Sequence, residues 1–168
     1  MLAFGATLPE ILTFFCRNAL YDRVQETIIG DVQTTLYANV DHILVSSEEV
    51  AQDITLMIIS GEDFATVAQQ FSLDTASSQT GGNLGDNPVQ LYVSEFADAI
   101  IAGQTGTILL PVETQFGWHV IRINSKEERP IDESNREQIT SALFSKWREA
   151  QLTTATVTLN PDWQSFIP

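Results

Sequence analysis

Two strand-like segments, residues 40–45 and 118–124, constrain the fold of this chain more than any other feature. Both are rich in β-branched residues, which favour extended backbone and pack well on a pleated surface. Each segment carries one of the only two histidines in the sequence, His42 and His119. Lone histidines on strands are most often ordinary core residues, but these two would meet if the segments were neighbours in one sheet.

The overall composition argues against several classes of partner. A net charge of −14 disfavours nucleic acid and anionic lipid, because both select for clustered lysine and arginine. No apolar run approaches the roughly 20 residues that a membrane-spanning helix needs. The start, Met1–Glu10, lacks a basic segment and a cleavage pattern, so no signal peptide is expected, although the chain could be a piece of a longer exported protein. The single cysteine, Cys16, cannot form an internal disulfide.

An amphipathic helix is predicted near each end of the chain. A capping pattern at Thr7 and a stop at Gly30 bound the first, and the second runs from Ile131 to about Leu152. In the tail, residues 153–168, a short strand at Val157 and Leu159 and a frayed end are both open. The apolar stripes are Ile11, Phe15 and Ala19 in the first helix and Ile139, Leu143 and Trp147 in the second. We expect the two stripes to pack on each other outside the central domain, and packing of the first helix on that domain is the alternative.

Between the two strand-like segments the sequence predicts three helices. The elements in order are helices at 48–60, 64–71 and 95–102, a glycine-rich loop at 72–86 between the last two, and a strand at 107–112. Ser46 or Ser47 and then Asp63 provide N-caps, whereas Pro111 weakens the last strand. The residues expected to be buried are Val50, Ala51, Ile54, Met57 and Ile58 in the first helix and Phe64, Val67, Ala68 and Phe71 in the second. Such an order implies an α+β domain with a small antiparallel sheet.

Five motifs in order resemble the parvulin family of peptidyl-prolyl isomerases. They are His-Ile-Leu-Val at 42–45, Ala-Gln-Gln-Phe-Ser-Leu-Asp at 68–74, Gly-Gly-Asn-Leu-Gly at 81–85, Glu-Phe at 95–96 and Thr-Gln-Phe-Gly-Trp-His at 114–119. The resemblance covers about half the chain and implies a four-stranded antiparallel sheet surrounded by helices. With flanking N- and C-terminal helices, the layout resembles SurA- and PrsA-type foldases. It implies a helical segment at 1–39, an isomerase domain at 40–126, and a helix and tail at 127–168.

The same resemblance implies the composition of the site. The apolar cup for the proline ring comprises Leu84, Tyr92 and Phe96, with Phe116 as a further substrate-binding residue. The catalytic polar network comprises His42, Asp74, Thr114 and His119. Rotation about an X–Pro amide requires no nucleophile, metal or cofactor, so none is expected. The sequence also lacks a GxSxG motif, a phosphate-binding loop and a His/Cys cluster with metal spacing.

Some positions depart from the family pattern. The stretch Asp86–Gln90 lacks a common aromatic pair, Tyr92 stands where methionine is common, and Ser94 replaces a common proline. Two functions stay open: a prolyl isomerase acting on unfolded or newly exported chains, and a catalytically weak domain that binds peptides as a chaperone module. Arg122 is the only Lys or Arg between residues 40 and 124, so specificity for phosphorylated substrates is not expected. Similarity to exported foldases implies an extracytoplasmic location.

Overall fold

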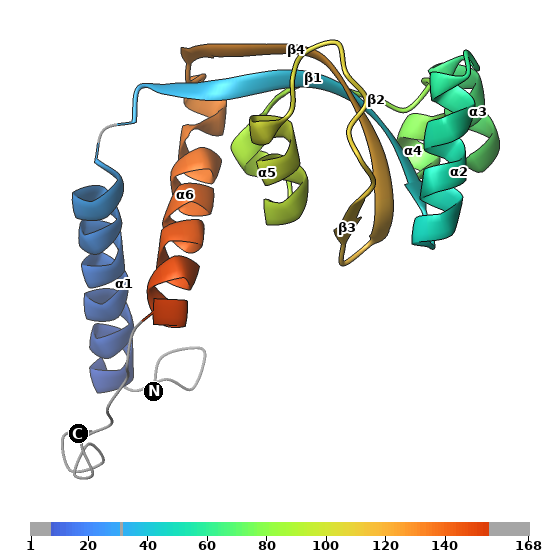
Figure 1. Ribbon diagram of the computed structural model, residues 1–168. Coiled ribbons are helices and arrows are strands. Elements are labelled where there is room, and N and C mark those ends of the chain that lie inside the picture. Colours follow the sequence, from blue (N-terminus) through green and yellow to red (C-terminus); the bar gives the residue numbers. More distant parts are fainter. Residues whose placement is uncertain (1–7, 31, 155–168) are drawn as a thin grey trace.

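The chain forms a curved antiparallel sheet with helices attached at both ends and beneath its middle (Figure 1). The structure, a computed structural model, describes residues 8–30 and 32–154. The elements are α1 Leu8–Ile29, β1 Thr34–Val45, α2 Glu48–Ile59, α3 Phe64–Phe71, α4 Thr75–Ser78, β2 Asn83–Pro88, a 3-10 turn η1 Val89–Leu91, α5 Ser94–Ala102, β3 Val112–Thr114, β4 Gly117–Pro130 and α6 Glu133–Thr154.

The sheet has four strands in the order β2-β1-β4-β3, and every neighbouring pair is antiparallel. Its centre is the long ladder between β1 and β4, which runs from the pair Thr34 and Pro130 to the pair Val45 and Trp118. A register shift at Asn39 separates the two halves of this ladder. The α+β class and the four-stranded sheet are therefore confirmed, and both long strands extend past residues 40 and 126.

Alternation along β1 and β4 gives the sheet two faces with different cores. One core lies between the sheet and helices α2 and α3, and consists of Ile43, Val45, Ala51, Ile54, Ile58, Phe64, Val67, Ala68 and Val120. The other lies toward α5 and consists of Ala38, Val40, Val89, Phe96, Ala97, Ile100, Ile121 and Ile123. His42 and His119 lie on the α5 face, since the ring of Phe96 contacts both of them.

Helices α1 and α6 lie side by side at one end of the sheet (Figure 1). Tyr21 of α1 meets Phe144 of α6 edge to face at a ring-centre distance of 4.9 Å, and Trp147 stacks on Phe144 at 5.5 Å. The two terminal helices therefore meet, but through Tyr21 and Phe144 rather than through the predicted stripes, since Ala19 is exposed and Leu143 lies toward α5. The side chains of Ile11 and Phe15, and the tail from residue 155 onward, lie outside the described residues.

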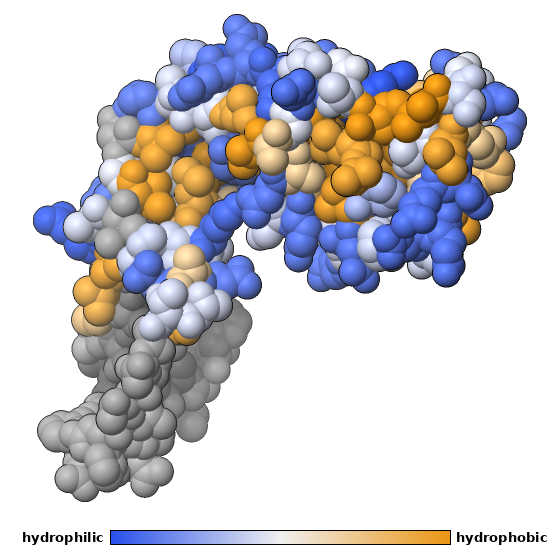
Figure 2. All heavy atoms as spheres, in the orientation of Figure 1, coloured by the Kyte–Doolittle hydropathy of each residue, from blue (hydrophilic) through white to orange (hydrophobic). Residues whose placement is uncertain are grey.

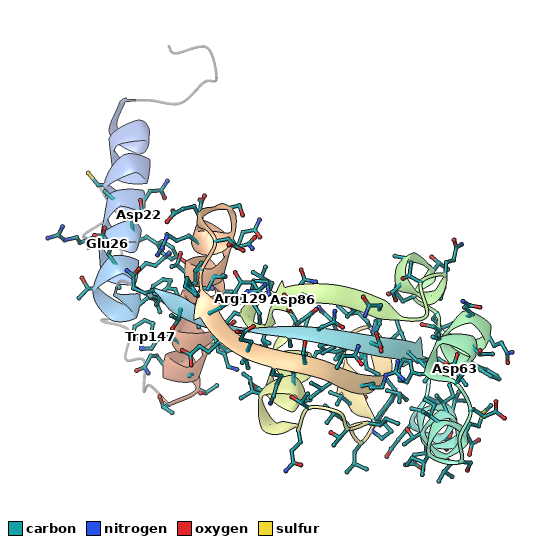
Figure 3. The ribbon with its side chains drawn as sticks, turned by 90° about the horizontal axis from the view of Figure 1, so that it is seen from above. Asp22, Glu26, Asp63, Asp86, Arg129 and Trp147 are labelled. Atoms are coloured by element: carbon teal, nitrogen blue, oxygen red, sulfur yellow. The ribbon has the colours of Figure 1, made fainter. Side chains whose placement is uncertain are left out.

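An ion pair crosses the sheet close to this helical end. Arg129 of β4 reaches Asp86 of β2 at 2.6 Å, passing over β1 (Figure 3). Its guanidinium lies 3.8 Å from the ring centre of Tyr37, the β1 residue beneath it. Three strands are thus joined at one level by charge and by a cation–π contact.

Several local predictions are confirmed at their caps. Ser47 caps α2 by accepting from the Val50 N–H, and Asp63 caps α3 by accepting from the Thr66 N–H. Gly30 follows α1 with a positive φ of 65°. Ser47 and Asp63 satisfy N–H groups in the first turn of a helix, which have no partner within the helix. Gly30 permits the left-handed backbone conformation that often follows a helix C-terminus.

Other local predictions are wrong. The segment 72–86 is not a loop throughout, because it contains α4 and the start of β2. The segment 107–112 pairs only partly with β4, through an isolated bridge from Ile108 to Arg122 and the backbone bonds of Thr107 and Leu109 beside it. The regular strand starts after Pro111, which has no N–H for the ladder. Val50 and Phe71, expected in the core, are 40% and 42% exposed.

Candidate active site

The two histidines meet on the α5 face of the central ladder. His42 pairs in register with Ile121, so His119 lies two residues away on the same face of the neighbouring strand. The two Nδ1 atoms are 3.1 Å apart, and the rings stack at 5.4 Å with an angle of 19°. Both side chains are buried, so this contact replaces the water that each nitrogen would otherwise bind.

Asp74 joins the histidines from the start of α4. It is the N-cap of that short helix, and its Oδ1 accepts from the Ala76 N–H at 3.1 Å. The other oxygen, Oδ2, therefore points to the Nε2 of His42 at 2.8 Å and accepts from the hydroxyl of Ser77 at 2.5 Å. Ser72 anchors this turn to β1, because its Oγ accepts from the N–H groups of Leu44 and Asp74.

Thr114 closes the other end of the network. It is the last residue of β3, and its Oγ1 lies 2.8 Å from the Nε2 of His119. The same oxygen accepts from the backbone N–H of Phe116 at 3.2 Å. The tight turn between β3 and β4 thus brings a buried hydroxyl against the second histidine.

These contacts fix the direction of the hydrogen bonds. The carboxylate of Asp74 can only accept, so the Nε2 of His42 carries a hydrogen. With both rings neutral, His42 accepts at Nδ1 from the Nδ1–H of His119. His119 then accepts at Nε2 from the hydroxyl of Thr114. One continuous chain of donors runs from Thr114 through both rings to Asp74.

The environment of the network favours this neutral arrangement of His119. The pKa of His119 is lowered to about 4, chiefly by burial and also by the neighbouring His42, against the opposing attraction of Asp74. The pKa of Asp74 is lowered chiefly by the hydrogen bond from Ser77, and bonds from His42 and the Ala76 N–H add to this effect. At neutral pH the network therefore combines an uncharged His119 with a carboxylate.

An aromatic cluster adjoins the histidines. The ring of Phe96 lies edge-on to His42 at 5.9 Å and to His119 at 5.2 Å, and Tyr92 lies 5.0 Å from Phe96. Leu84 packs against the same core and is half-buried. Phe116 differs, because its ring is 63% exposed at the rim while its backbone N–H joins the network. The eight expected site residues thus lie around one place, with Phe96 buried and Phe116 exposed.

Two residues that support the site were not identified from the sequence. Ser77 is buried, lies 3.1 Å from the Nε2 of His42, and donates to Asp74. Gly82, with a φ of +82°, accepts from the backbone N–H of His42 at 2.8 Å, and a Cβ there would lie 2.4 Å from the carbonyl oxygen of His42. The Gly-Gly pair at 81–82 is part of a motif in the sequence, whereas no sequence pattern distinguishes Ser77 from the other serines of the segment 72–86.

The opposite face of the same ladder carries a second buried polar group. Asp41 accepts from Arg122 Nε at 2.9 Å and Nη2 at 2.6 Å, and from Asn83 at 2.6 Å. Burial alone would raise the pKa of Asp41, but hydrogen bonds from Asn124, Asn83 and Arg122 outweigh it and lower the pKa. Arg122 also lies 4.5 Å from the ring centre of Phe64. The domain's single arginine is therefore engaged away from the histidines.

The sheet order and the paired histidines define a parvulin-type domain, and comparison with known proteins identifies its family. The family model for the PPIC-type PPIase domain, also described as rotamase, matches residues 42–125. This match extends over half the chain, and the chain belongs to the PPIC-type family of peptidyl-prolyl isomerases. The resemblance inferred from the motifs is thereby confirmed.

Similar proteins extend the match into the helical flanks. Foldase protein PrsA of Clostridium tetani is 31% identical over 161 residues, which cover 83% of this chain and 48% of that protein. The crystal structure of the peptidylprolyl isomerase PrsA from Bacillus cereus superposes with a TM-score of 0.62 at 29% identity, over 96% of this chain and 69% of that one. A structure of SurA-like chaperones from Campylobacter jejuni gives a TM-score of 0.54 at 26% identity, over 85% and 62% of the two chains. The chain spans less than half the length of the curated relatives it matches.

No helix within residues 8–30 and 32–154 is long and apolar enough to cross a membrane. The same residues contain no group of three or more His, Cys, Asp or Glu side chains that could hold a metal ion.

Proposed function

We propose that this chain catalyses cis/trans isomerisation of X–Pro bonds in unfolded polypeptides and so assists their folding. The observation that carries the proposal is the continuous donor chain from Thr114 through His119 and His42 to Asp74, set beside the aromatic cluster. Membership of the PPIC-type family supports the same activity. Proline-containing segments of unfolded proteins are the substrates that this activity requires.

The proposed mechanism is non-covalent. An X–Pro amide loses its resonance in the twisted transition state, which costs ~18–20 kcal/mol in water. The twisted form separates less charge than the planar amide, so a site poor in water stabilises it selectively. Leu84, Tyr92 and Phe96 supply the apolar surface for the proline ring, and Phe116 covers it from the rim.

The polar residues have a separate role in this mechanism. The network around His42 and His119 provides fixed hydrogen-bonding groups next to the rotating carbonyl without offering a nucleophile. Asp74 is the catalytic group closest to solvent, since a quarter of its side chain is exposed. Its carboxylate faces the carbonyl, while the histidines and Thr114 hold its position.

Phosphorylated substrates have no basic subsite in this proposal. Arg122, Arg129 and Lys146 each form an ion pair with a carboxylate. Lys126 donates to the three carbonyls of Ile100, Ile101 and Gly103 at the end of α5. A phosphate, with close to two negative charges, would meet cations that are already paired with carboxylates or, for Lys126, already hydrogen-bonded to backbone carbonyls.

The wider biological setting is proposed by analogy with the relatives. Foldase names and SurA-like neighbours support clients that are unfolded exported proteins and a location outside the cytoplasm. We place the helical segment at 1–39, the isomerase domain at 40–126, and the helix and tail at 127–168. The family match over 42–125 supports the central range.

The deciding experiment measures isomerisation of a proline-containing tetrapeptide by the whole chain. We expect clear acceleration over the uncatalysed rate, and a loss of about five- to tenfold in kcat/KM for Thr114→Val, which removes the hydroxyl bound to His119. Thr27→Val is the matched control, because Thr27 is exposed on α1 and bonds only within its helix.

A catalytically weak, peptide-binding chaperone module is the competing function. The near-complete burial of Phe96 favours it, because a 3% exposed ring leaves little surface for a proline. Binding of proline peptides without acceleration would establish this alternative and reject the isomerase.

A further inference from the structure

A groove runs beside the candidate site, between α5 and α6. It has a volume of about 520 Å³ and is bounded by η1 and the first turns of α5 on one side, by α6 on the other, and by Gln115 of the β3–β4 turn at one end. Its apolar lining includes Ile101, which is 50% exposed, and the half-buried Val93 and Leu143. In Figure 2 apolar surface is visible around α5.

The groove is continuous with the proposed proline cup. Tyr92 belongs to both, since it lines the groove and its ring packs against Phe96 at 5.0 Å. Gln115 lies between Thr114, which binds His119, and Phe116 at the rim. An extended peptide whose proline sits against Phe96 can therefore continue directly into the groove.

The groove carries an excess of negative charge. Glu95 at the start of α5 and Glu149 on α6 both line it and are exposed. Lys146 is the only basic residue among the lining side chains, and it forms an ion pair with Asp98 of α5. The two glutamates are therefore not balanced by a free cation within the groove.

We infer that this groove binds the segment of the client polypeptide next to the isomerised proline, and that it selects segments combining apolar residues with Lys or Arg. The inference rests on the proposed isomerase function and adds a specificity determinant from α6, outside the family match at 42–125. Apolar side chains of the client cover Val93, Ile101 and Leu143, while a basic side chain pairs with Glu95 or Glu149. Isomerisation is thereby directed to prolines in basic, apolar stretches of unfolded chains.

The test compares matched peptides of about ten residues that differ only in carrying Lys or Glu beside the X–Pro unit, placed on either side in separate sets. The measured quantity is the ratio of their kcat/KM values with the whole chain. At low salt we expect a ratio of about five to ten in favour of Lys on one side of the proline, shrinking toward one at about 0.5 M salt.

Matched variants separate the groove from the field of the whole chain. Glu95→Gln with Glu149→Gln should lower the ratio to about two or less, because both carboxylates of the groove are removed. Glu62→Gln with Glu137→Gln removes the same charge from exposed positions outside the groove, and should leave the ratio unchanged. Lys146→Gln should raise the ratio, since it frees the charge of Asp98.

The possible outcomes distinguish failure of the isomerase function from failure of the groove proposal. A parent chain that does not accelerate a bare tetrapeptide rejects the proposed isomerase function itself. Turnover of the tetrapeptide with equal ratios for the two double variants rejects the groove alone. Amide NMR shifts on adding the Lys peptide provide a second readout: shifts at 142–149 together with 92–97 support the groove, and shifts confined to the histidine network reject it.

Discussion

The two faces of the β1–β4 ladder accommodate buried polar groups in different ways. Toward α2 and α3, Asp41 and Arg122 form a charged pair with additional bonds from asparagine side chains. Toward α5, His42 and His119 form a hydrogen-bonded pair that ends on Asp74 and Thr114. The same two strands thus carry a fixed ion pair on one side and a titratable network on the other.

The two arrangements differ in whether their protonation and hydrogen bonds change between neutral and mildly acidic pH. The pKa of Asp41 is lowered, so its carboxylate stays charged and paired with Arg122 through the pH range in which the histidine network changes. The histidine network can change, because a proton taken up in acid at the Nε2 of His119 would turn that nitrogen from an acceptor into a donor toward Thr114. Thr114 would then donate to the carbonyl of Gly117, 3.4 Å away. We therefore expect stability to depend most on the ion-pair face and activity on the histidine face.

The largest effect should come from breaking the ion pair. Asp41→Ala leaves the guanidinium of Arg122 without its partner, and we expect the free energy of unfolding to fall by about 3–4 kcal/mol. Turnover per folded molecule should stay close to that of the parent, because Asp41 faces away from the histidines. Denaturant unfolding with kinetics on the folded fraction measures both, and Asp53→Ala, an exposed position, is the control. Intact stability with reduced turnover would reverse the comparison.

Acid should weaken the histidine face at a higher pH than the ion-pair face. The unfolded chain binds a proton at His119 below pH about 6.5, whereas the folded chain does so only near pH 4. Stability from this group is therefore complete above pH 6.5 and decreases as the pH falls toward 4, by up to about 3 kcal/mol. Because the pKa values of Asp41 and Asp74 are lowered, the stability that these two carboxylates contribute is lost only below about pH 3.8.

Unfolding curves measured at several pH values test this expectation. His119→Phe removes the titrating ring and keeps His42, so the slope between pH 6.5 and 4 should flatten. A variant with the same slope as the parent would assign the acid sensitivity to another group.

A smaller effect distinguishes catalysis from helix capping. Asp74→Asn keeps an oxygen for the Ala76 N–H but removes the carboxylate, so kcat/KM should fall about tenfold with a stability loss under about 1 kcal/mol. Asp63→Asn is the matched control, since Asp63 caps α3 in the same way away from the histidines. Equal kinetic losses in the two variants would remove Asp74 from the catalytic network.

The smallest expected effect concerns phosphate. An unphosphorylated Ser-Pro peptide should be turned over about two- to fivefold better than its phosphorylated form, most at low salt, because Arg122 is bound to Asp41 on the opposite face. Competition between the two peptides at two salt concentrations measures the preference. Preferred turnover of the phosphopeptide would contradict this expectation and would mean that other basic residues form a phosphate subsite.

The sequence predicted the features that depend on strong local patterns. The β-branched runs around His42 and His119 identified the central strands, and the caps at Ser47 and Asp63 marked the helix starts. The motif order predicted that the eight site residues would lie together. Their geometry agrees with the expectation, and their catalytic roles stay predictions.

The features that were missed depend on tertiary contacts. Strand β2, with the sequence Asn-Leu-Gly-Asp-Asn-Pro, has little intrinsic strand preference and is extended because it pairs with β1. Val50 and Phe71 fit the apolar periodicity of their helices, but no other described element covers them fully. Ser77 could be recognised only once α4 aimed its hydroxyl at Asp74.

The pairing of Thr34 with Pro130 has a consequence for the architecture as a whole. The polypeptide enters and leaves the sheet at adjacent points, about 5 Å apart, and Ile131 still bonds to the carbonyl of Gln33 beyond them. The sheet lies between α1 and α6 in the sequence and already holds the two ends of this intervening segment together. Packing α1 against α6 therefore costs little additional loop-closure entropy. Because its two ends are adjacent, a segment of this kind can be exchanged, duplicated or deleted during evolution without separating the two helices that flank it.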